Sequence, residues 1–220
     1  MARMARVVIP GYPHHLTQRG NRRKETFFCK NDYEVYLKLM AEWCSRSDVS
    51  IWAYCLMPNH AHLIAVPDSE EGLRRAIGEA HRRYTRHINF RENWRDHLWQ
   101  GRFTSYVMDE QYLLAAARYI ELNPVRAKLA TDPRKYPWSS AAAHIEACDD
   151  ALVVVAPLLK IVDDWMGFLA GGVSDEEYKA LRKHERTGRP LGNTSFIGRL
   201  EEKLAKRLIP QKGGRPKKKN

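Results

Sequence analysis

The chain has 220 residues, 44% of them hydrophobic, which is enough for one domain with a substantial core and an appendage. A net charge of +11 favours partners that carry dense negative charge, nucleic acid first. The longest apolar run, residues 151–159, is too short for a membrane span, and no apolar stretch follows the N-terminal arginines. We therefore expect no membrane partner and no signal peptide. The four cysteines form no CxxC motif, which favours a reduced compartment over a disulfide framework or a zinc cluster.

The first third of the chain predicts a strand, a helix and a hairpin. The strand covers 12–19 and ends at Gly20 and Asn21. The helix has Asp32 as its cap and apolar residues at helical spacing up to Cys44. Two strands follow, 49–57 and 60–66, and the turn between them contains Pro58 and Asn59.

The next elements are less regular. A helix over 68–90, capped by Asp68 or Ser69, has a basic polar face. A strand over 98–109 precedes a helix over 110–123, which Pro124 stops. Residues 132–140 read as a loop, and the chain from 141 onwards as mainly helical. Strands and helices without a βαβ rhythm predict an α+β fold, with helices packed on an antiparallel sheet.

The C-terminal part differs from the rest in charge. Residues 199–220 contain nine Lys or Arg against two Glu, and the last ten hold no apolar side chain besides proline. Such composition predicts disorder in isolation. We therefore divide the chain into a main domain (1–145), a helical extension (146–198) and a basic tail (199–220) that we expect to be disordered and to bind nucleic acid. The amphipathic helix predicted over 193–208 could pack on the domain, recognise duplex DNA or mediate self-association.

Two histidines stand one residue apart in the stretch LMPNHAHLIAV (56–66). Because side chains alternate along a strand, His60 and His62 point to the same face. The pair could be a solvated or hydrogen-bonded pair, as most HxH matches are. The apolar flanks instead indicate a buried strand, where two imidazoles need partners. A divalent metal ion would satisfy both.

The helix over 110–123 offers further polar groups. Tyr119 and Asn123 are four residues apart, so they share one face of the helix. Tyr119 could simply be a core residue, and Asn123 could simply end the helix. Together with the histidines, however, they could form a metal site with an adjacent nucleophile.

Four blocks carry a resemblance to a known family: MPNHAHLI, LWQGRF, YIELNPVRAKL and YPWSS, in this order. They resemble the single-tyrosine HUH transposases, and most closely the group associated with repetitive extragenic palindromes (REP) in bacteria. The resemblance covers roughly residues 6–145. It implies an HUH palm of ferredoxin-like type, and the HUH pair falls on His60 and His62. The nucleophile falls on Tyr119, and the third metal ligand, which is glutamine in some relatives, on Asn123.

The resemblance implies a transposase that cuts and rejoins single-stranded or hairpin DNA in the bacterial cytoplasm, at the nucleoid, as a monomer or homodimer. Free tyrosine is a weak nucleophile at pH 7, with only about 0.1% ionised. Mg²⁺ or Mn²⁺ on His60, His62 and Asn123 would polarise the scissile phosphate. Tyr119 would then form a 5′-phosphotyrosine link and release a 3′-OH.

Basic residues outside this site are candidates for DNA contact. They come from the segment 18–24, from the helix over 68–90, from LWQGRF and from the tail: Arg19, Arg22, Arg23, Arg74, Arg75, Arg82, Arg83, Arg86, Arg102 and Arg215. Each could also be an ordinary solvated side chain. Arg215 lies in a Gly-Arg-Pro tripeptide of the kind that enters a narrow minor groove. We leave His14 and His15 out of the metal site and interpret them as DNA contacts.

Two other functions compete with the transposase. A catalytically silent DNA-binding regulator of repetitive palindromes would keep the fold without the chemistry, but His60, His62, Tyr119 and Asn123 are all present. A metal-dependent phosphoesterase for a small substrate would not need the basic tail. Steep loss of cleavage with rising salt would separate the transposase from the phosphoesterase, because counterion release drives DNA binding.

Overall fold

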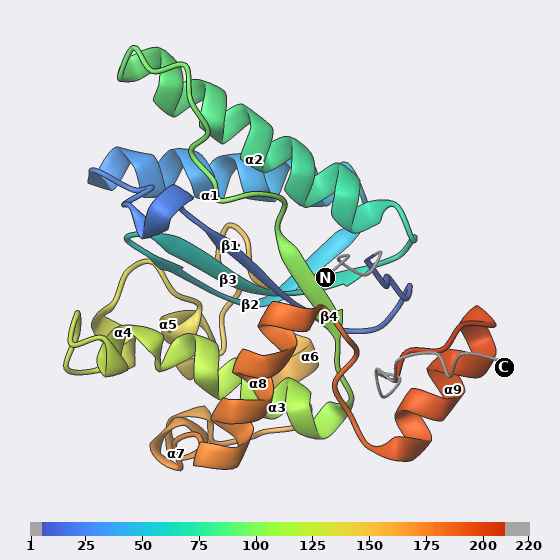
Figure 1. The fold of residues 1–220 in the computed structure, drawn as a ribbon. Helices are drawn as coiled ribbons and strands as arrows, with labels where there is room; N and C mark the ends of the chain where they lie inside the picture. Colours follow the sequence, from blue (N-terminus) through green and yellow to red (C-terminus); the bar gives the residue numbers. More distant parts are fainter. Residues whose placement is uncertain (1–5, 210–220) are drawn as a thin grey trace, which may run out of the picture.

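The computed structural model describes residues 6–209 and has a four-stranded antiparallel sheet at its centre (Figure 1). The strand order is β2-β3-β1-β4. The strands are β1 (His14–Arg19), β2 (Val49–Met57), β3 (His60–Pro67) and β4 (Thr104–Val107). The predicted hairpin of 49–57 and 60–66 is confirmed, and so is the α+β fold with helices on an antiparallel sheet.

Two long helices cover one face of the sheet: α1 (Lys30–Ser45) and α2 (Gly72–Arg91) (Figure 1). Their inward side chains meet Ala61, Leu63 and Ala65 of β3 in the larger apolar core, which contains many aromatic rings. Asp32, the predicted cap of α1, stands at the third helical position and accepts hydrogen bonds from the backbone N–H groups of Phe28 and Cys29. Asp32 therefore caps α1 from its first turn, as the acidic residue of a capping box does.

The opposite face carries shorter helices (Figure 1). They are α3 (Glu110–Glu121), α4 (Asn123–Arg126), α5 (Ala141–Ile145), α6 (Ala156–Leu159), α7 (Trp165–Ala170) and α8 (Asp175–Thr187). Of these, α3 packs on β2 and β3, and α8 packs on β1 and β4. Two 3₁₀ turns, Asn21–Arg23 and Pro133–Lys135, complete the elements before α9.

Helix α9 (Thr194–Leu204) follows a short bridge between Met108 and Leu191 at the β4 edge. Phe196 and Leu200 of α9 pack with Leu208 against Val7 and Ile9 near the start of the chain. The prediction of disorder over 199–220 is therefore wrong for 199–209. The amphipathic helix predicted over 193–208 is confirmed as α9, and of its three alternatives the structure shows packing on the domain. The rest of the predicted tail lies outside the described residues.

Three sequence boundaries shift in the structure. Helix α2 begins at Gly72, so neither Asp68 nor Ser69 caps it. Of the strand predicted over 98–109, only Thr104–Val107 forms a regular strand, while Trp99 and Met108 make single bridges to Gly20 and Leu191. Helix α3 ends at Glu121, and Pro124 occupies the first turn of α4, where its missing N–H costs no hydrogen bond. The predicted divisions at 145 and 198 stay predictions, although α8 packs directly on the sheet.

Within the described part of the chain, no helix combines the length and apolar character needed to cross a bilayer.

Candidate active site

The predicted histidine pair lies on the sheet face that α3 and α8 cover. In register, His62 pairs with Thr17 and His60 with Arg19 of β1, so all four side chains belong to the same face. His62 is fully buried, and its ring centroid is 5.0 Å from that of His60. Its Nε2 atom is buried without a hydrogen-bond partner among the described residues. A metal ion or a polar group of a substrate could bind to this free nitrogen.

A chain of hydrogen bonds fixes the other nitrogen of His62. The hydroxyl of Tyr106, on β4, donates to the carbonyl oxygen of Leu181 at 3.4 Å, so it accepts from His15 Nδ1 at 2.6 Å. His15 Nε2 can then accept from His62 Nδ1, 3.0 Å away. Thr17 Oγ1 lies 3.2 Å from the same Nδ1 atom. With the hydrogen bonds running in this direction, Nδ1 of His62 carries the proton and the lone pair is on Nε2, the atom without a partner.

The three site histidines are held neutral. Burial lowers the pKa of His15 and of His60 to about 3. Burial lowers the pKa of His62 well below its usual value, and the nearby positive charges of Arg19 and Arg126 lower it further. Neutral imidazoles near pH 7 are able to bind a metal ion without first losing a proton.

Tyr119 reaches the site from α3. Its ring centroid lies 5.4 Å from that of His62 and 6.0 Å from that of His15, and its side chain is buried. Burial raises the pKa of Tyr119 to about 12, and the charge of Glu185 raises it as well. A hydrogen bond from Arg182 and the charges of Arg126 and Arg182 act in the opposite direction. The phenol is therefore protonated at neutral pH but stands among groups that favour its anion.

Helix α3 is anchored by the carboxylate of Glu121, which is fully buried. The Glu121 carboxylate accepts hydrogen bonds from Ser140 Oγ at 2.5 Å and Trp165 Nε1 at 2.7 Å, and His144 Nδ1 lies 2.7 Å away. Ser140 belongs to the YPWSS block, so this block fixes the helix that carries Tyr119. A buried carboxylate with three partners resists rotation or sliding of the helix.

Asn123 follows at the start of α4 and is buried. Its Oδ1 atom accepts a hydrogen bond from Arg126 at 2.8 Å, and its Nδ2 atom is buried without a partner in the described chain. The Arg126 guanidinium also lies 4.6 Å from the centroid of the Tyr119 ring. Arg126 therefore links Asn123, at the start of α4, to the ring of Tyr119 on α3.

Helix α8 adds two charged residues that the sequence analysis did not single out. Glu185 Oε1 lies 3.8 Å from His62 Nδ1, and burial raises the pKa of the Glu185 carboxyl. Arg182 is paired with Glu185 at 3.5 Å and contacts Tyr119. Arg126 and Arg182 are both exposed to solvent, and both contact Tyr119.

His15, His62 and Glu185 could hold a metal ion. One ligand atom from each lies within 4.8 Å of the others, and all three residues have little exposure. The sequence analysis left His15 out of the metal site and interpreted it as a DNA contact, whereas the structure places it fully buried against His62. His14 is also fully buried, since Nε2 accepts from the N–H of Ile9 and Nδ1 faces the carbonyl of Tyr12, so neither histidine offers a DNA contact.

The predicted DNA-binding arginines fall into three groups. Arg19 lies at the site, with Arg22 and Arg23 in the loop directly after it. Arg74, Arg75, Arg82, Arg83 and Arg86 lie on α2, across the sheet from the histidines (Figure 1). Arg74 pairs with Glu71, and Arg82 and Arg83 pair with Glu79. Arg102 is exposed before β4, away from Tyr119, and Arg215 lies outside the described residues.

One of the missed residues had a signal in the sequence, and two had none. His15 alternates with Thr17 and Arg19 along β1, so it lies on the same face as these residues and diagonally next to His62. Glu185 and Arg182 give no local signal, because only the packing of α8 across the sheet brings residues 120 positions downstream to the histidines.

Comparisons with known proteins identify the family and the fold. The family described as "Transposase IS200 like" matches residues 10–123. A solved REP-associated tyrosine transposase bound to a REP hairpin has a similar fold, with a TM-score of 0.58 and 18% identity over 70% of this chain and 92% of that one. A transposase crystal structure from Deinococcus radiodurans R1 is 16% identical, with a TM-score of 0.38 over 55% of this chain and 96% of that one. No curated protein matches.

Proposed function

The chain belongs to the IS200-like transposase family, and we propose that it cleaves and rejoins single-stranded or hairpin DNA through Tyr119. The observation that carries the proposal is the unpartnered, buried Nε2 atom of His62 beside the ring of Tyr119. If Tyr119 and His62 were only core residues, we would expect both ring nitrogens of His62 to have hydrogen-bond partners. The REP hairpin bound by the similar transposase indicates the class of DNA to test.

A divalent ion fits the donor set on the Nε2 side of His62, with His60 and Asn123 as the other ligands and Mg²⁺ or Mn²⁺ as the ion. His60 is neutral, and the amide oxygen of Asn123 has a second lone pair beyond the one that Arg126 uses. The alternative set of His15, His62 and Glu185 would require the 3.0 Å contact between His15 and His62 to open. We therefore favour the Nε2 side. When bound, the ion would polarise the scissile phosphate and offset the charge that builds on its oxygens.

The residues of the chain supply the nucleophile and its proton acceptor. Tyr119 Oη attacks the phosphorus, forming the O–P bond while the bond from phosphorus to the 3′ oxygen breaks. Glu185, which accepts a hydrogen bond from Tyr119, can take the phenol proton, and the 3′ oxygen takes up a proton as it leaves. No water is consumed, so the phosphotyrosine can pass the strand to another 3′-OH.

Arginines close to Tyr119 account for phosphate binding. Arg126 and Arg182 are exposed and flank Tyr119, and Arg19 is half-buried beside His60. The DNA phosphates would replace the contacts that Arg126 and Arg182 now make with the tyrosine ring and Glu185. The two exposed guanidinium groups would then guide the phosphate to Tyr119.

The proposal is tested with labelled DNA hairpins from palindromes that flank the source gene. Wild type and Tyr119→Phe are incubated with each hairpin and Mn²⁺, with and without chelator, and resolved on a denaturing gel. We expect a protein–DNA adduct in the wild type alone, lost when the metal is removed. Tyr178→Phe is the matched control, because its ring lies only 5.7 Å from that of Tyr119.

Binding without an adduct on any hairpin would favour the silent regulator instead. Cleavage that persists in Tyr119→Phe would make water the nucleophile.

The metal ligands are tested separately by Mn²⁺ titration. We expect His60→Ala and Asn123→Ala to weaken Mn²⁺ binding directly, whereas Glu185→Gln leaves it nearly unchanged. The reverse order would assign the ion to the group of His15, His62 and Glu185.

A further inference from the structure

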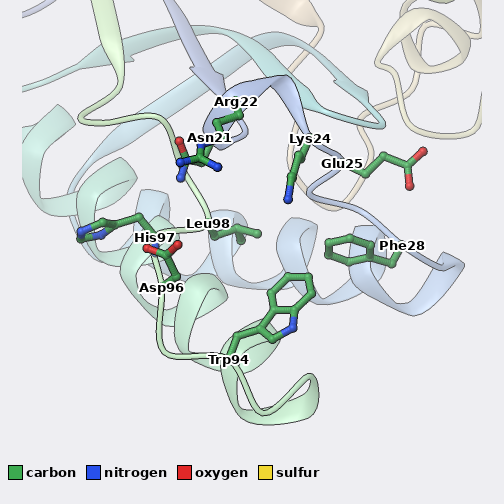
Figure 2. Close-up of a pocket in the computed structure, with 9 residues that line it drawn as sticks. All are labelled: Asn21, Arg22, Lys24, Glu25, Phe28, Trp94, Asp96, His97 and Leu98. Carbon is green, nitrogen blue, oxygen red and sulfur yellow. The ribbon is translucent and has the colours of Figure 1, made fainter.

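A cavity of about 280 Å³ lies beyond the end of β1, outside the site described above (Figure 2). Its walls come from the segment between β1 and α1 and from the segment that follows α2. The residues that matter for its chemistry are Asn21, Lys24, Phe28, Trp94 and Asp96. The volume is close to the lower end of the range for small-ligand sites, about 300–1,000 Å³.

Two aromatic side chains in this cavity are unusually exposed. Phe28 is 40% exposed and Trp94 is 46% exposed, although both are large apolar groups. Their ring centroids lie 5.6 Å apart at an interplanar angle of 81°, so they form a corner. One planar group can stack on one of these rings and touch the edge of the other. Stacking on aromatic side chains is how proteins bind unpaired bases.

The polar groups of the cavity suit a nucleotide. In Figure 2 the Lys24 side chain points into the space between Phe28 and Leu98, while Glu25 points away from it. Neither Arg22 nor Lys24 forms an ion pair within residues 6–209, unlike Arg91, which pairs with Asp32 below Phe28. Asn21 and Asp96 add amide and carboxylate groups that can meet the edge of a base.

The cavity is joined structurally to the histidine site. Asn59, the residue before His60, accepts a hydrogen bond from the N–H of Gly20 at 2.8 Å through its carbonyl oxygen. Its side-chain amide donates to the carbonyl of Arg23 at 3.1 Å. Arg22 and Arg23 have φ angles of 53° and 61°, a conformation that costs energy for residues other than glycine. The turn that positions His60 therefore also holds the wall of the cavity.

We propose that this cavity binds one unpaired DNA base in the single strand next to the cleaved phosphate. The inference rests on the proposed function, because it assumes that single-stranded DNA reaches His60. A strand that leaves the site past Arg19 and His60 meets the loop of Asn21 and Lys24 first. Its base would stack on Trp94 or Phe28, with Lys24 on the adjacent phosphate.

The test uses fluorescence anisotropy of the full chain with hairpins that carry single-stranded flanks and with the same hairpins without flanks. We expect Trp94→Ala to weaken binding of the flanked hairpin about 5- to 150-fold, the range for loss of one stacked base, and Phe28→Ala to weaken it less. Binding of the blunt hairpin stays unchanged. Phe90→Ala, which removes a 90% exposed ring from α2 outside the cavity, is the matched control and should bind both hairpins as the wild type does.

A scan of abasic sites along the flank identifies the bound base. One abasic position should weaken wild-type binding to the same extent as Trp94→Ala, and the two changes together should cause no further loss. Wild-type affinity in both Trp94→Ala and Phe28→Ala would overturn the inference while leaving the transposase intact. Equal losses on blunt and flanked hairpins would assign the cavity to duplex and also overturn it. Failure of the wild type to bind any hairpin would overturn the inference and the proposed function together.

Discussion

The two faces of the sheet are built from alternate residues of the same strands but have opposite chemistry. On β3, Ala61, Leu63 and Ala65 enter the core under α1 and α2, whereas His60 and His62 face α3 and α8. The first face contains stacked aromatic rings, such as Phe27 on Tyr33 at 4.5 Å. The second contains buried imidazoles and a carboxylate.

This difference shows how a small fold separates stability from chemistry. Burial of the apolar face contributes most to the free energy of folding, so truncating a side chain there lowers the stability most. Within residues 6–209, the polar face keeps two buried nitrogens without hydrogen-bond partners, His62 Nε2 and Asn123 Nδ2, which a fold selected only for stability would satisfy. Changes on the two faces should therefore have different consequences.

The largest expected effect is on the polar face. His62→Ala should reduce adduct formation by at least about 10³-fold, since metal stabilisation of the phosphate contributes several kcal/mol. The free energy of unfolding should change far less than the activity does. The measurement is the adduct rate in Mn²⁺ beside urea unfolding. A variant that forms adduct at the wild-type rate would remove His62 from the mechanism.

On the apolar face, Phe27→Ala should lower the free energy of unfolding by about 3–5 kcal/mol. Phe27 is buried among Tyr33, Tyr36 and Tyr84, and the cavity left behind cannot collapse easily. At a temperature where the variant is still folded, its adduct rate should match the wild type. Loss of activity without loss of stability would show that the two faces are not separate.

Tyr106→Phe should weaken Mn²⁺ binding about 10- to 100-fold, as the loss of an outer partner of a metal-binding histidine does. The variant removes the hydroxyl that orients His15 and, through it, His62. Tyr54→Phe is the control, because its hydroxyl is also buried but donates to Asp150. Equal Mn²⁺ affinity in both variants would contradict the orienting role of Tyr106.

The smallest effect concerns His81, the buried histidine of the apolar face, whose Nε2 atom lies 2.8 Å from the hydroxyl of Tyr36. Burial lowers the pKa of His81 to about 3, so between pH 6.5 and 3 the unfolded chain binds a proton that the folded chain does not. Stability must then fall as the pH falls through this window. His81→Gln should reduce the slope by up to about 1.4 kcal/mol per pH unit. Urea unfolding between pH 4 and 7 measures it, and an unchanged slope would contradict the assignment.

The sequence predicts local features of this molecule well because they depend on neighbouring residues. The alternation of His60 and His62 and the spacing of Tyr119 and Asn123 follow from strand and helix periods. Glu185 and Arg182 could not be predicted, since their position depends on how α8 packs across β1 and β4. The amphipathic pattern of 193–208 allowed for packing of Leu208 on the domain, but it could not identify the distant apolar partner, Val7.

The most direct test of the central claim is peptide mass spectrometry of the denaturant-resistant adduct formed on a hairpin with Mn²⁺. The account predicts a nucleotide attached through its 5′ phosphate to the peptide that contains Tyr119, and to no other tyrosine. Attachment to Tyr178, or hydrolysed DNA without any protein-linked nucleotide, would contradict it.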